Sequence, residues 1–284
     1  MKNKIFGLCL ILFSFLFLSF YHVMRKLKVG VCSGIENMDV VINSGADYLE
    51  PGVQSFLVPA EPESKFLDNL AKIKGKSISI YACNSFIPGS MKSVGQEACH
   101  DSILKFAETA FRRAKKSGIK VIVFGSGGSR KIPDGFSKED AKKQFTDLLK
   151  KMAPLAKKYG IMVVIEPLNK GETNFINSLA EAAEISTLVH DDNIQILADF
   201  YHMMRENESA DEIIKYGAYI RHCHIAEKEK RTPPGTMGDD FSSYFIALKK
   251  IDYKGRISIE ANWDKFELQV KGAVAALQGI IQKN

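Results

Sequence analysis

The fold is decided by residues 162–199, which read MVVIEPLNKGETNFINSLAEAAEISTLVHDDNIQILAD. Two short apolar runs, 162–165 and 194–197, stand at the two ends of this stretch. A helix-like segment at 178–188 lies between them, with Asn177 in position to cap it. Short and nearly continuous apolar runs are typical of parallel strands that are buried on both faces. The stretch therefore predicts one strand–helix–strand unit.

The same alternation continues in both directions along the chain. Apolar runs that read as strands lie at 28–32, 48–50, 77–81, 120–124, 162–165, 194–197, 219–223 and 256–259. A second helix should begin after Ser137, whose side chain can cap the backbone near Asp140, and should end at Gly160. Eight strands, each with room for a helix, favour a closed (β/α)₈ TIM barrel over an open doubly wound sheet. We expect residues 25–284 to form this barrel as a single domain.

Composition sets limits on the function. The chain has 284 residues, of which 45% are hydrophobic and 25% are charged, so it has the balance of an ordinary globular protein. The net charge of +6 lies largely in helix-like stretches and reads as solvated helix faces, so no nucleic-acid partner is expected. The five cysteines form no CxxC pair, which indicates free thiols rather than a disulfide or zinc framework.

The first 24 residues stand apart from this pattern. Lys2 and Lys4 precede an apolar run at 5–20, but no Ala-x-Ala cleavage site follows. One interpretation is a signal or membrane anchor, in which residues 5–24 would contact the membrane and the barrel would be exported or anchored. The other is an upstream start, with translation beginning at Met24 and a cytoplasmic enzyme. Both stay open, and we leave the segment out of the fold argument.

Four consecutive predicted strands end in residues that bind metal ions. These residues are Glu166, Asp199, His224 and Glu260. In a barrel the carboxyl ends of the strands converge on one mouth, so the four side chains should meet there. Three carboxylates and one imidazole suit a hard or borderline divalent ion such as Mn²⁺, Mg²⁺ or Co²⁺, with Zn²⁺ as an alternative. Glu50, at the end of the second predicted strand, faces the same mouth and is expected to contact the substrate.

Three further features allow more than one interpretation. His202 follows Asp199 by three residues, so it either orients that carboxylate or contacts the substrate. The glycine-rich segment 125–128, which reads GSGG, either cradles an anion or makes a tight turn after its strand. His222 points the same way as His224 along a strand and could simply fill the barrel interior.

Several motifs together resemble a known family. They are EPLNKGE at 166–172, NFIN at 174–177, ADFYHM at 198–203, HCH at 222–224 and IE at 259–260. The chain resembles the sugar isomerase/epimerase superfamily with the xylose-isomerase-like barrel. By motif it is most similar to ketose 3-epimerases and hydroxypyruvate isomerases, with inosose-processing enzymes as near relatives. The resemblance runs from about residue 28 to 284 and is most specific over 165–260.

The resemblance implies a role for each matching position. It implies one divalent metal ion, with Mn²⁺ as the first expectation, held by Glu166, Asp199, His224 and Glu260. Glu166 and Glu260 would double as the acid/base pair. The substrate would be contacted by Glu172, by His202 and by a basic residue after the metal histidine, which is Lys230 or Arg231 here. Barrels of this family often pair, which leaves a homo-oligomer open.

These expectations define a reaction class. A sugar or sugar phosphate would lose a proton next to its carbonyl and pass through an enediolate, as in isomerases and epimerases. An inosose-type dehydratase or lyase is an alternative on the same site, because it needs the same enolate with a leaving hydroxyl. A nuclease of the AP-endonuclease type would need further His and Asp ligands for a zinc cluster, and the chain has only six histidines. A barrel that binds sugars without turnover would not need the Glu166/Glu260 pair.

Overall fold

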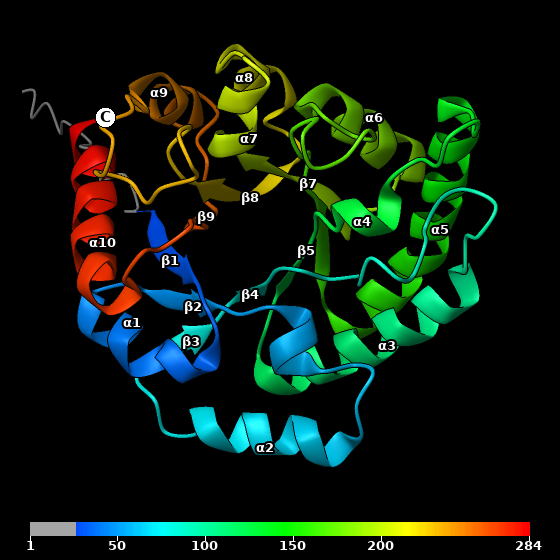
Figure 1. Cartoon of the computed structure of the whole chain (residues 1–284), viewed down its shortest axis with the longest axis horizontal. Coiled ribbons are helices and arrows are strands. Elements are labelled where there is room, and N and C mark those ends of the chain that lie inside the picture. Colours follow the sequence, from blue (N-terminus) through cyan, green and yellow to red (C-terminus); the bar gives the residue numbers. More distant parts are fainter. Residues whose placement is uncertain (1–26) are drawn as a thin grey trace, which may run out of the picture.

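The structure is a computed structural model that describes residues 27–284 (Figure 1). The strands are β1 (Lys28–Cys32), β2 (Tyr48–Glu50), β3 (Ser79–Ile80), β4 (Ala82–Cys83), β5 (Val121–Phe124), β6 (Met162–Ile165), β7 (Ile194–Asp199), β8 (Ile220–Ile225) and β9 (Arg256–Ile259). The helices are α1 (Met38–Ser44), α2 (Glu63–Ile73), α3 (His100–Ser117), α4 (Gly127–Arg130), α5 (Lys138–Tyr159), α6 (Leu179–Val189), α7 (Phe200–Arg205), α8 (Asp211–Tyr216), α9 (Ser242–Lys250) and α10 (Phe266–Lys283). Figure 1 shows the strands at the centre and the helices arranged around them.

The strands form one parallel sheet that curls into a nearly closed barrel. Their order is β3-β2-β1-β9-β8-β7-β6-β5-β4, so the first and last strands of the chain are neighbours. The two edges of this sheet, β3 and β4, follow one another in the chain with only Tyr81 between them. The backbone itself therefore joins the edges, and the TIM barrel expected from the sequence is confirmed.

The third strand differs from its expected position. The sequence placed it at 77–81, whereas the structure has two short pieces that span 79–83. The first piece pairs with β2 and the second with β5, because the strand breaks at Tyr81 where it passes from one neighbour to the other. Asn84 thereby becomes the first residue beyond this strand, and an isolated parallel bridge joins it to Gly52.

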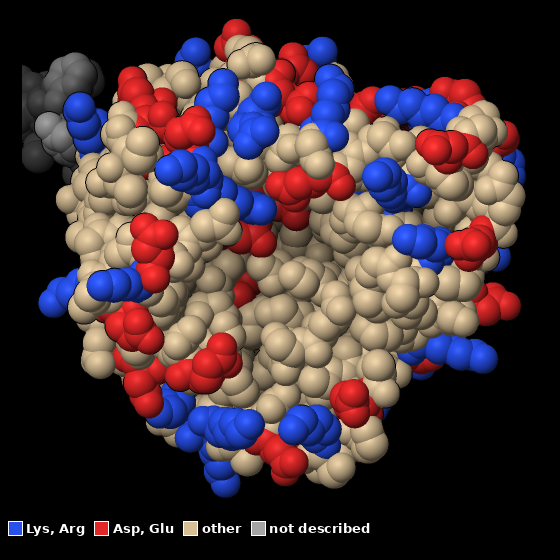
Figure 2. Space-filling model, in the orientation of Figure 1, with Lys and Arg blue, Asp and Glu red and all other residues tan. Residues whose placement is uncertain are grey.

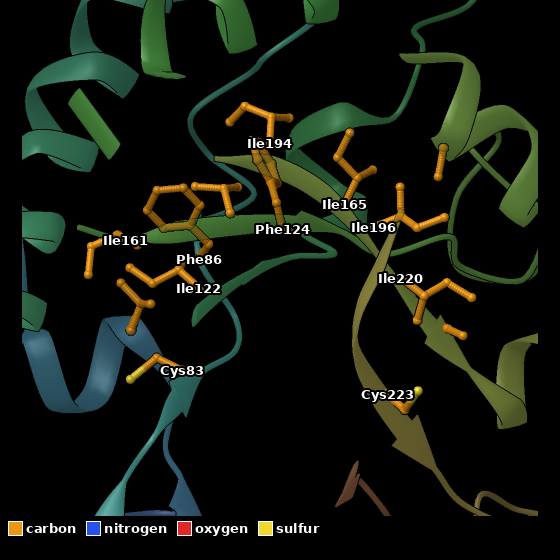
Figure 3. Close-up of a cluster of buried hydrophobic side chains, with 14 of the residues drawn as sticks. Cys83, Phe86, Ile122, Phe124, Ile161, Ile165, Ile194, Ile196, Ile220 and Cys223 are labelled. Atoms are coloured by element: carbon orange, nitrogen blue, oxygen red, sulfur yellow. The ribbon is translucent and has the colours of Figure 1, made fainter. Parts of the chain in front are cut away.

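Side chains alternate between the inside and the outside of the barrel. Along β5, Val121 and Val123 belong to a small interior cluster, whereas Ile122 and Phe124 belong to the large layer between strands and helices. Figure 3 shows part of that outer layer, including Phe124 and Ile165. This period of two follows from the pleat of a strand, and it fixes which residues point toward the barrel axis.

The helix ends are set by local capping. The hydroxyl of Ser137 accepts a hydrogen bond from the backbone N–H of Asp140, and α5 ends at Gly160 with φ of 69°, as the sequence predicted. The prediction for α6 is wrong by one residue. Ser178 is the cap, while the side-chain amide of Asn177 donates to the carbonyl oxygens of Leu168 and Thr173.

The predicted segment 1–24, with the alternative start at Met24, lies outside the described residues. Within residues 27–284, no helix is both long and apolar enough to cross a membrane.

Candidate active site

A group of polar side chains lies at the carboxyl ends of the barrel strands. Each expected metal ligand lies two residues after an inward-facing position of its own strand. The pairs are Val164 and Glu166, Leu197 and Asp199, His222 and His224, and Ser258 and Glu260. Because the side-chain period of a strand is two, all four ligands point toward the barrel axis at the carboxyl end of the strands. Figure 2 shows that this face is hollowed at its centre and that acidic side chains lie in the hollow.

The structure brings the four expected ligands together. Ligand atoms of Glu166, Asp199, His224 and Glu260 all lie within 4.8 Å of one another. Nδ1 of His224 is 3.1 Å from Oε1 of Glu166 and 3.1 Å from Oε2 of Glu260. The imidazole thus lies between the two carboxylates that were expected to form the acid/base pair.

The donor chemistry of this group fits a divalent cation. Three carboxylates with one imidazole form the kind of mixed oxygen and nitrogen set that suits Mn²⁺, Mg²⁺ or Co²⁺, and Zn²⁺ accepts it as well. The four side chains converge although three of them carry like charge, and a cation between them would offset that repulsion. Like charges placed this close are otherwise unfavourable.

Gly125 leaves room for the side chain of Glu166. A Cβ atom built on Gly125 would lie 2.2 Å from Oε2 of Glu166. A side chain at this position would therefore displace the carboxylate. Within the glycine-rich segment 125–128, Gly125 lets the backbone lie close to Glu166, and Gly127 begins α4. This arrangement favours the interpretation of the segment as a turn over its interpretation as an anion cradle.

Asp199 is oriented by the helix that follows it. Oδ1 accepts a hydrogen bond of 2.7 Å from the backbone N–H of Tyr201 and a longer one of 3.4 Å from that of His202. These contacts cap α7 and leave Oδ2 free to face Arg231 at 3.3 Å and His202 at 3.6 Å.

The pKa values of the two expected acid/base residues are shifted in opposite directions. Burial, and then the nearby charge of Glu260, raises the pKa of Glu166 above the usual range of a carboxyl. Burial alone would also raise the pKa of Glu260, but the charges of Arg231 and His224 outweigh it and lower that pKa. The two carboxyls therefore differ in how readily each binds a proton.

Arg231, and not Lys230, reaches the group. Its Nη2 donates to Oε2 of Glu260 at 2.5 Å and to Oδ2 of Asp199 at 3.3 Å, and its Nε donates to the carbonyl oxygen of Glu260 at 3.1 Å. The guanidinium carbon also lies 4.8 Å from the ring centroid of Tyr201. Lys230 is exposed. Of the two basic residues expected from the sequence, the structure places only Arg231 at the site.

The loop that carries Arg231 is held by a buried carboxylate. Glu227 is fully buried, and its oxygens accept hydrogen bonds from the hydroxyl of Thr232 and from the backbone N–H groups of residues 235–238. Lys230 and Arg231 both have positive φ, at 56° and 54°. This left-handed backbone conformation is unfavourable for residues other than glycine. The contacts of Glu227 hold the loop in this conformation.

Glu172 lies between Arg231 and His202. Oε1 of Glu172 is 3.9 Å from Nη1 of Arg231 and 4.0 Å from Nδ1 of His202. Nδ1 of His202 accepts a hydrogen bond of 3.1 Å from the backbone N–H of Asn169, so its proton is carried by Nε2, which is 3.6 Å from Oδ2 of Asp199. His202 therefore lies next to a ligand and next to Glu172, which fits either of its two expected roles.

Glu50 lies deeper than the sequence suggested. It is fully buried, and its oxygens contact Nε2 of His224 at 3.0 Å, Nε2 of His222 at 2.8 Å and the hydroxyl of Ser258 at 2.5 Å. Both oxygens are thus engaged with side chains of the barrel interior. Its expected contact with substrate stays a prediction, whereas its contact with His224 is a feature of the structure.

Sequence reasoning missed two residues that touch the ligands. Asn84 donates a hydrogen bond of 2.8 Å from Nδ2 to Oε1 of Glu260. Arg130 is fully buried in α4, and its Nη2 donates to the backbone carbonyl of Glu166 at 2.7 Å. Asn84 follows a barrel strand as the candidate ligands do, but the sequence placed that strand two residues too early. Arg130 has no such signal, since a surface arginine would give the same pattern.

Comparison with known proteins identifies the family. The chain belongs to the xylose isomerase-like TIM barrel family, whose model matches residues 38–282.

Its homologues include ketose 3-epimerases and hydroxypyruvate isomerases. The chain is 35% identical over 114 residues to L-ribulose 3-epimerase of Methylomonas sp. (strain DH-1), which covers 40% of each protein. It is 35% identical over 130 residues to a putative hydroxypyruvate isomerase of Drosophila melanogaster, covering 44% of this chain and 49% of that one. The matches therefore span less than half the length of these relatives.

Solved structures share the fold over most of the chain. The apo form of 3-keto-D-glucoside 4-epimerase, YcjR, from E. coli has a TM-score of 0.77 at 22% identity and covers 89% of this chain and 100% of that one. The IOLI protein with a bound zinc atom has a TM-score of 0.74 at 20% identity and covers 90% and 99%. At this identity the likeness establishes the fold alone.

Proposed function

We propose that this protein is a divalent-metal-dependent isomerase or epimerase of sugars, sugar phosphates or similar hydroxy ketones. The observation that carries the proposal is the convergence of Glu166, Asp199, His224 and Glu260 within 4.8 Å at the mouth of the barrel. Support also comes from relatives named as ketose 3-epimerases and hydroxypyruvate isomerases, and from a zinc-containing structure with the same fold. Manganese is the ion we would test first.

The proposed reaction is the movement of a proton next to a carbonyl. Glu260, whose pKa is lowered by Arg231 and His224 against the effect of burial, is the carboxylate suited to remove a proton. Glu166, whose pKa is raised by burial and by Glu260, is suited to return one. The substrate in between would pass through an enediolate. The chemistry supplied by a bound divalent ion would be polarisation of the substrate carbonyl, which makes the neighbouring C–H more acidic.

The other residues of the site would orient the substrate. Arg231 offers N–H groups directed into the mouth, and Glu172 is partly exposed beside it. A guanidinium and a carboxylate are a suitable pair for the hydroxyl groups of a polyol, because one donates hydrogen bonds and the other accepts them. His202 lies next to Asp199 and Glu172 and would take part in the same substrate contacts.

The proposal is tested by isotope exchange. The full chain would be stripped of metal, reloaded with Mn²⁺, Mg²⁺, Co²⁺ or Zn²⁺, and incubated with ketoses and keto-inositols in D₂O. We expect deuterium to enter next to the carbonyl, and we expect Glu166→Gln and Glu260→Gln to slow its entry by about 10²- to 10⁴-fold. Glu267→Gln, on the exposed face of α10, is the matched control.

The products separate the alternatives. An inverted centre indicates an epimerase, a shifted carbonyl an isomerase, and loss of a hydroxyl an inosose-type dehydratase. Absence of exchange on every substrate, in protein that has bound metal, would contradict the proposal and favour a nuclease or a binder without turnover.

A further inference from the structure

A buried polar cluster lies directly beneath the candidate metal centre. It consists of Glu50, His222, His224 and Ser258, all of which are fully buried, together with Tyr48, whose hydroxyl lies 2.7 Å from that of Ser258. Glu50 is its centre. One carboxylate oxygen contacts Nε2 of His224, and the other contacts Nε2 of His222 and the hydroxyl of Ser258. A buried carboxylate with this many partners is held in a single orientation.

The cluster distinguishes the two ring nitrogens of His224. Nε2 lies 3.0 Å from Oε1 of Glu50, on the inner side of the ring. Nδ1 lies on the outer side, 3.1 Å from both Glu166 and Glu260. A histidine that binds a metal must leave the ligating nitrogen unprotonated, so the remaining proton belongs on the other nitrogen. An ionised carboxylate such as Glu50 accepts a hydrogen bond from this N–H group more strongly than a neutral acceptor would.

We propose that Glu50 is a positioning residue that fixes His224 with its proton on Nε2 and thereby presents Nδ1 to the metal ion. The inference rests on the proposed metal centre and adds a residue that does not itself bind the ion. His222 and Ser258 donate to the second oxygen of Glu50 and so keep the carboxylate in place. A carboxylate behind a metal-binding imidazole orients the ring and raises its affinity as a ligand.

His222 has a distinct part in this arrangement. Its Nδ1 is buried and has no hydrogen-bond partner among the described residues. Its Nε2 therefore carries the proton that is donated to Glu50. The two histidines converge on one carboxylate, and only His224 also faces the candidate ligands.

The test measures metal binding and the position of the proton, without any substrate. In the wild-type protein loaded with Zn²⁺, which is diamagnetic, long-range ¹H–¹⁵N spectra of the imidazoles should show His224 protonated at Nε2. In Glu50→Gln, whose amide can donate as well as accept, the affinity for Zn²⁺ and Mn²⁺ should fall by about 10- to 100-fold. Ser258→Ala, which removes one of the hydrogen bonds that hold Glu50, should give a smaller loss in the same direction.

The matched control is Glu208→Gln. It makes the same chemical change at a partly buried carboxylate that caps α6 instead of facing the barrel interior, and it should leave metal affinity unchanged. The wild-type spectrum keeps the test valid even if Glu50→Gln does not fold.

Three results would overturn the inference in a protein that does bind metal. The first is protonation of His224 at Nδ1 in the zinc-loaded protein. The second is a zinc ion held instead by Cys32, Glu50 and Nε2 of His224, the other group of potential ligands in residues 27–284, which would remove the Nε2 proton. The third is unchanged affinity in Glu50→Gln. A wild-type protein that binds no metal would overturn this inference and the metal dependence together, whereas metal binding without isotope exchange would contradict only the proposed reaction.

Discussion

Asn84 donates a hydrogen bond of 2.8 Å from its side-chain nitrogen to Oε1 of Glu260, joining the end of the third barrel strand to the end of the last one. The other oxygen of Glu260 accepts a hydrogen bond from Nη2 of Arg231. The carboxylate that we propose as the base is therefore held from both sides, with one oxygen fixed by a neutral amide and the other by a guanidinium.

Replacing Asn84 by alanine should lower kcat/KM by about 10- to 100-fold, because a hydrogen bond to a charged group contributes roughly 1.5–3 kcal/mol. Steady-state kinetics of the metal-loaded enzyme measures the effect. Asn193→Ala is the control, since it removes a comparable side-chain hydrogen bond, 2.8 Å to the carbonyl of Ile161, at the opposite end of the barrel. Equal kinetic losses in both variants would show that Asn84 acts only through stability.

Asn84 also shows where sequence reasoning stops. The convergence of the four candidate ligands could be predicted because each one follows a strand-like run, and the period of two then points it toward the axis. The third strand offers no such run. It consists of two pieces of two residues each, interrupted at Tyr81, and a hydrophobic pattern cannot place strands that short. The resulting error in register hid the residue that follows.

The role of Glu50 could not be predicted for a different reason. Its position at a strand end and its inward direction follow from the sequence, and both are found in the structure. Its partners His224 and Ser258 are 174 and 208 residues away in the chain. Which side chains meet inside a barrel depends on strand register and tilt, and neither can be read from the residues of one strand.

Gly125 should be intolerant of even the smallest side chain. In Gly125→Ala the added methyl group would lie 2.2 Å from Oε2 of Glu166, so the carboxylate must move away from the other ligands. We expect metal affinity to fall by about 10-fold or more, measured by calorimetric titration. Gly279→Ala in α10, where a Cβ meets nothing within 4 Å, should leave metal affinity unchanged. Normal affinity in Gly125→Ala would show that Glu166 is not a ligand.

Arg231→Lys should impair the enzyme although the charge is kept. Arg231 makes separate hydrogen bonds from Nε and Nη2, and a lysine ammonium cannot reproduce that fork. We expect kcat/KM to fall by about 10-fold or more, with part of the loss in KM if the guanidinium also contacts the substrate. Lys230→Ala is the matched control on the preceding, exposed residue and should behave as wild type. A loss of kcat/KM in Lys230→Ala with normal kcat/KM in Arg231→Lys would assign the role to Lys230.

Removal of metal should abolish activity and leave the barrel folded. The layer between strands and helices and a small cluster inside the barrel are apolar, and neither contains a candidate ligand. Adding Mn²⁺ at about 100 times its Kd should stabilise the protein by about 2.7 kcal/mol, which corresponds to roughly 5–10 °C in Tm for a domain of this size. Asp199→Asn, in which asparagine can still cap α7, should lose most of this shift. Full activity after chelation would contradict the metal dependence.

Glu208 should make stability fall as pH rises. Burial, opposed by a hydrogen bond from the backbone N–H of Leu179, raises the pKa of Glu208 to about 7, above its usual 4.5. Between these two values the folded state binds the proton more tightly than the unfolded state, so the free energy of unfolding decreases as pH rises through this window. Because the side chain is partly exposed, the effect should be on the order of 1–3 kcal/mol. Urea unfolding of wild type and Glu208→Gln at pH 5 and pH 7.5 measures it.

The control for this pH dependence is Glu63, a carboxyl whose pKa is shifted in the opposite direction. Hydrogen bonds from Arg112 lower the pKa of Glu63 to about 2, so its contribution to stability is present above pH 4.5 and is lost as pH falls toward 2. The difference in unfolding free energy between wild type and Glu63→Gln should therefore be the same at pH 5 and pH 7.5, while the difference for Glu208→Gln changes. If the two variants show the same dependence over this interval, Glu208 titrates in its ordinary range, and its hydrogen bond to the start of α6 outweighs its burial.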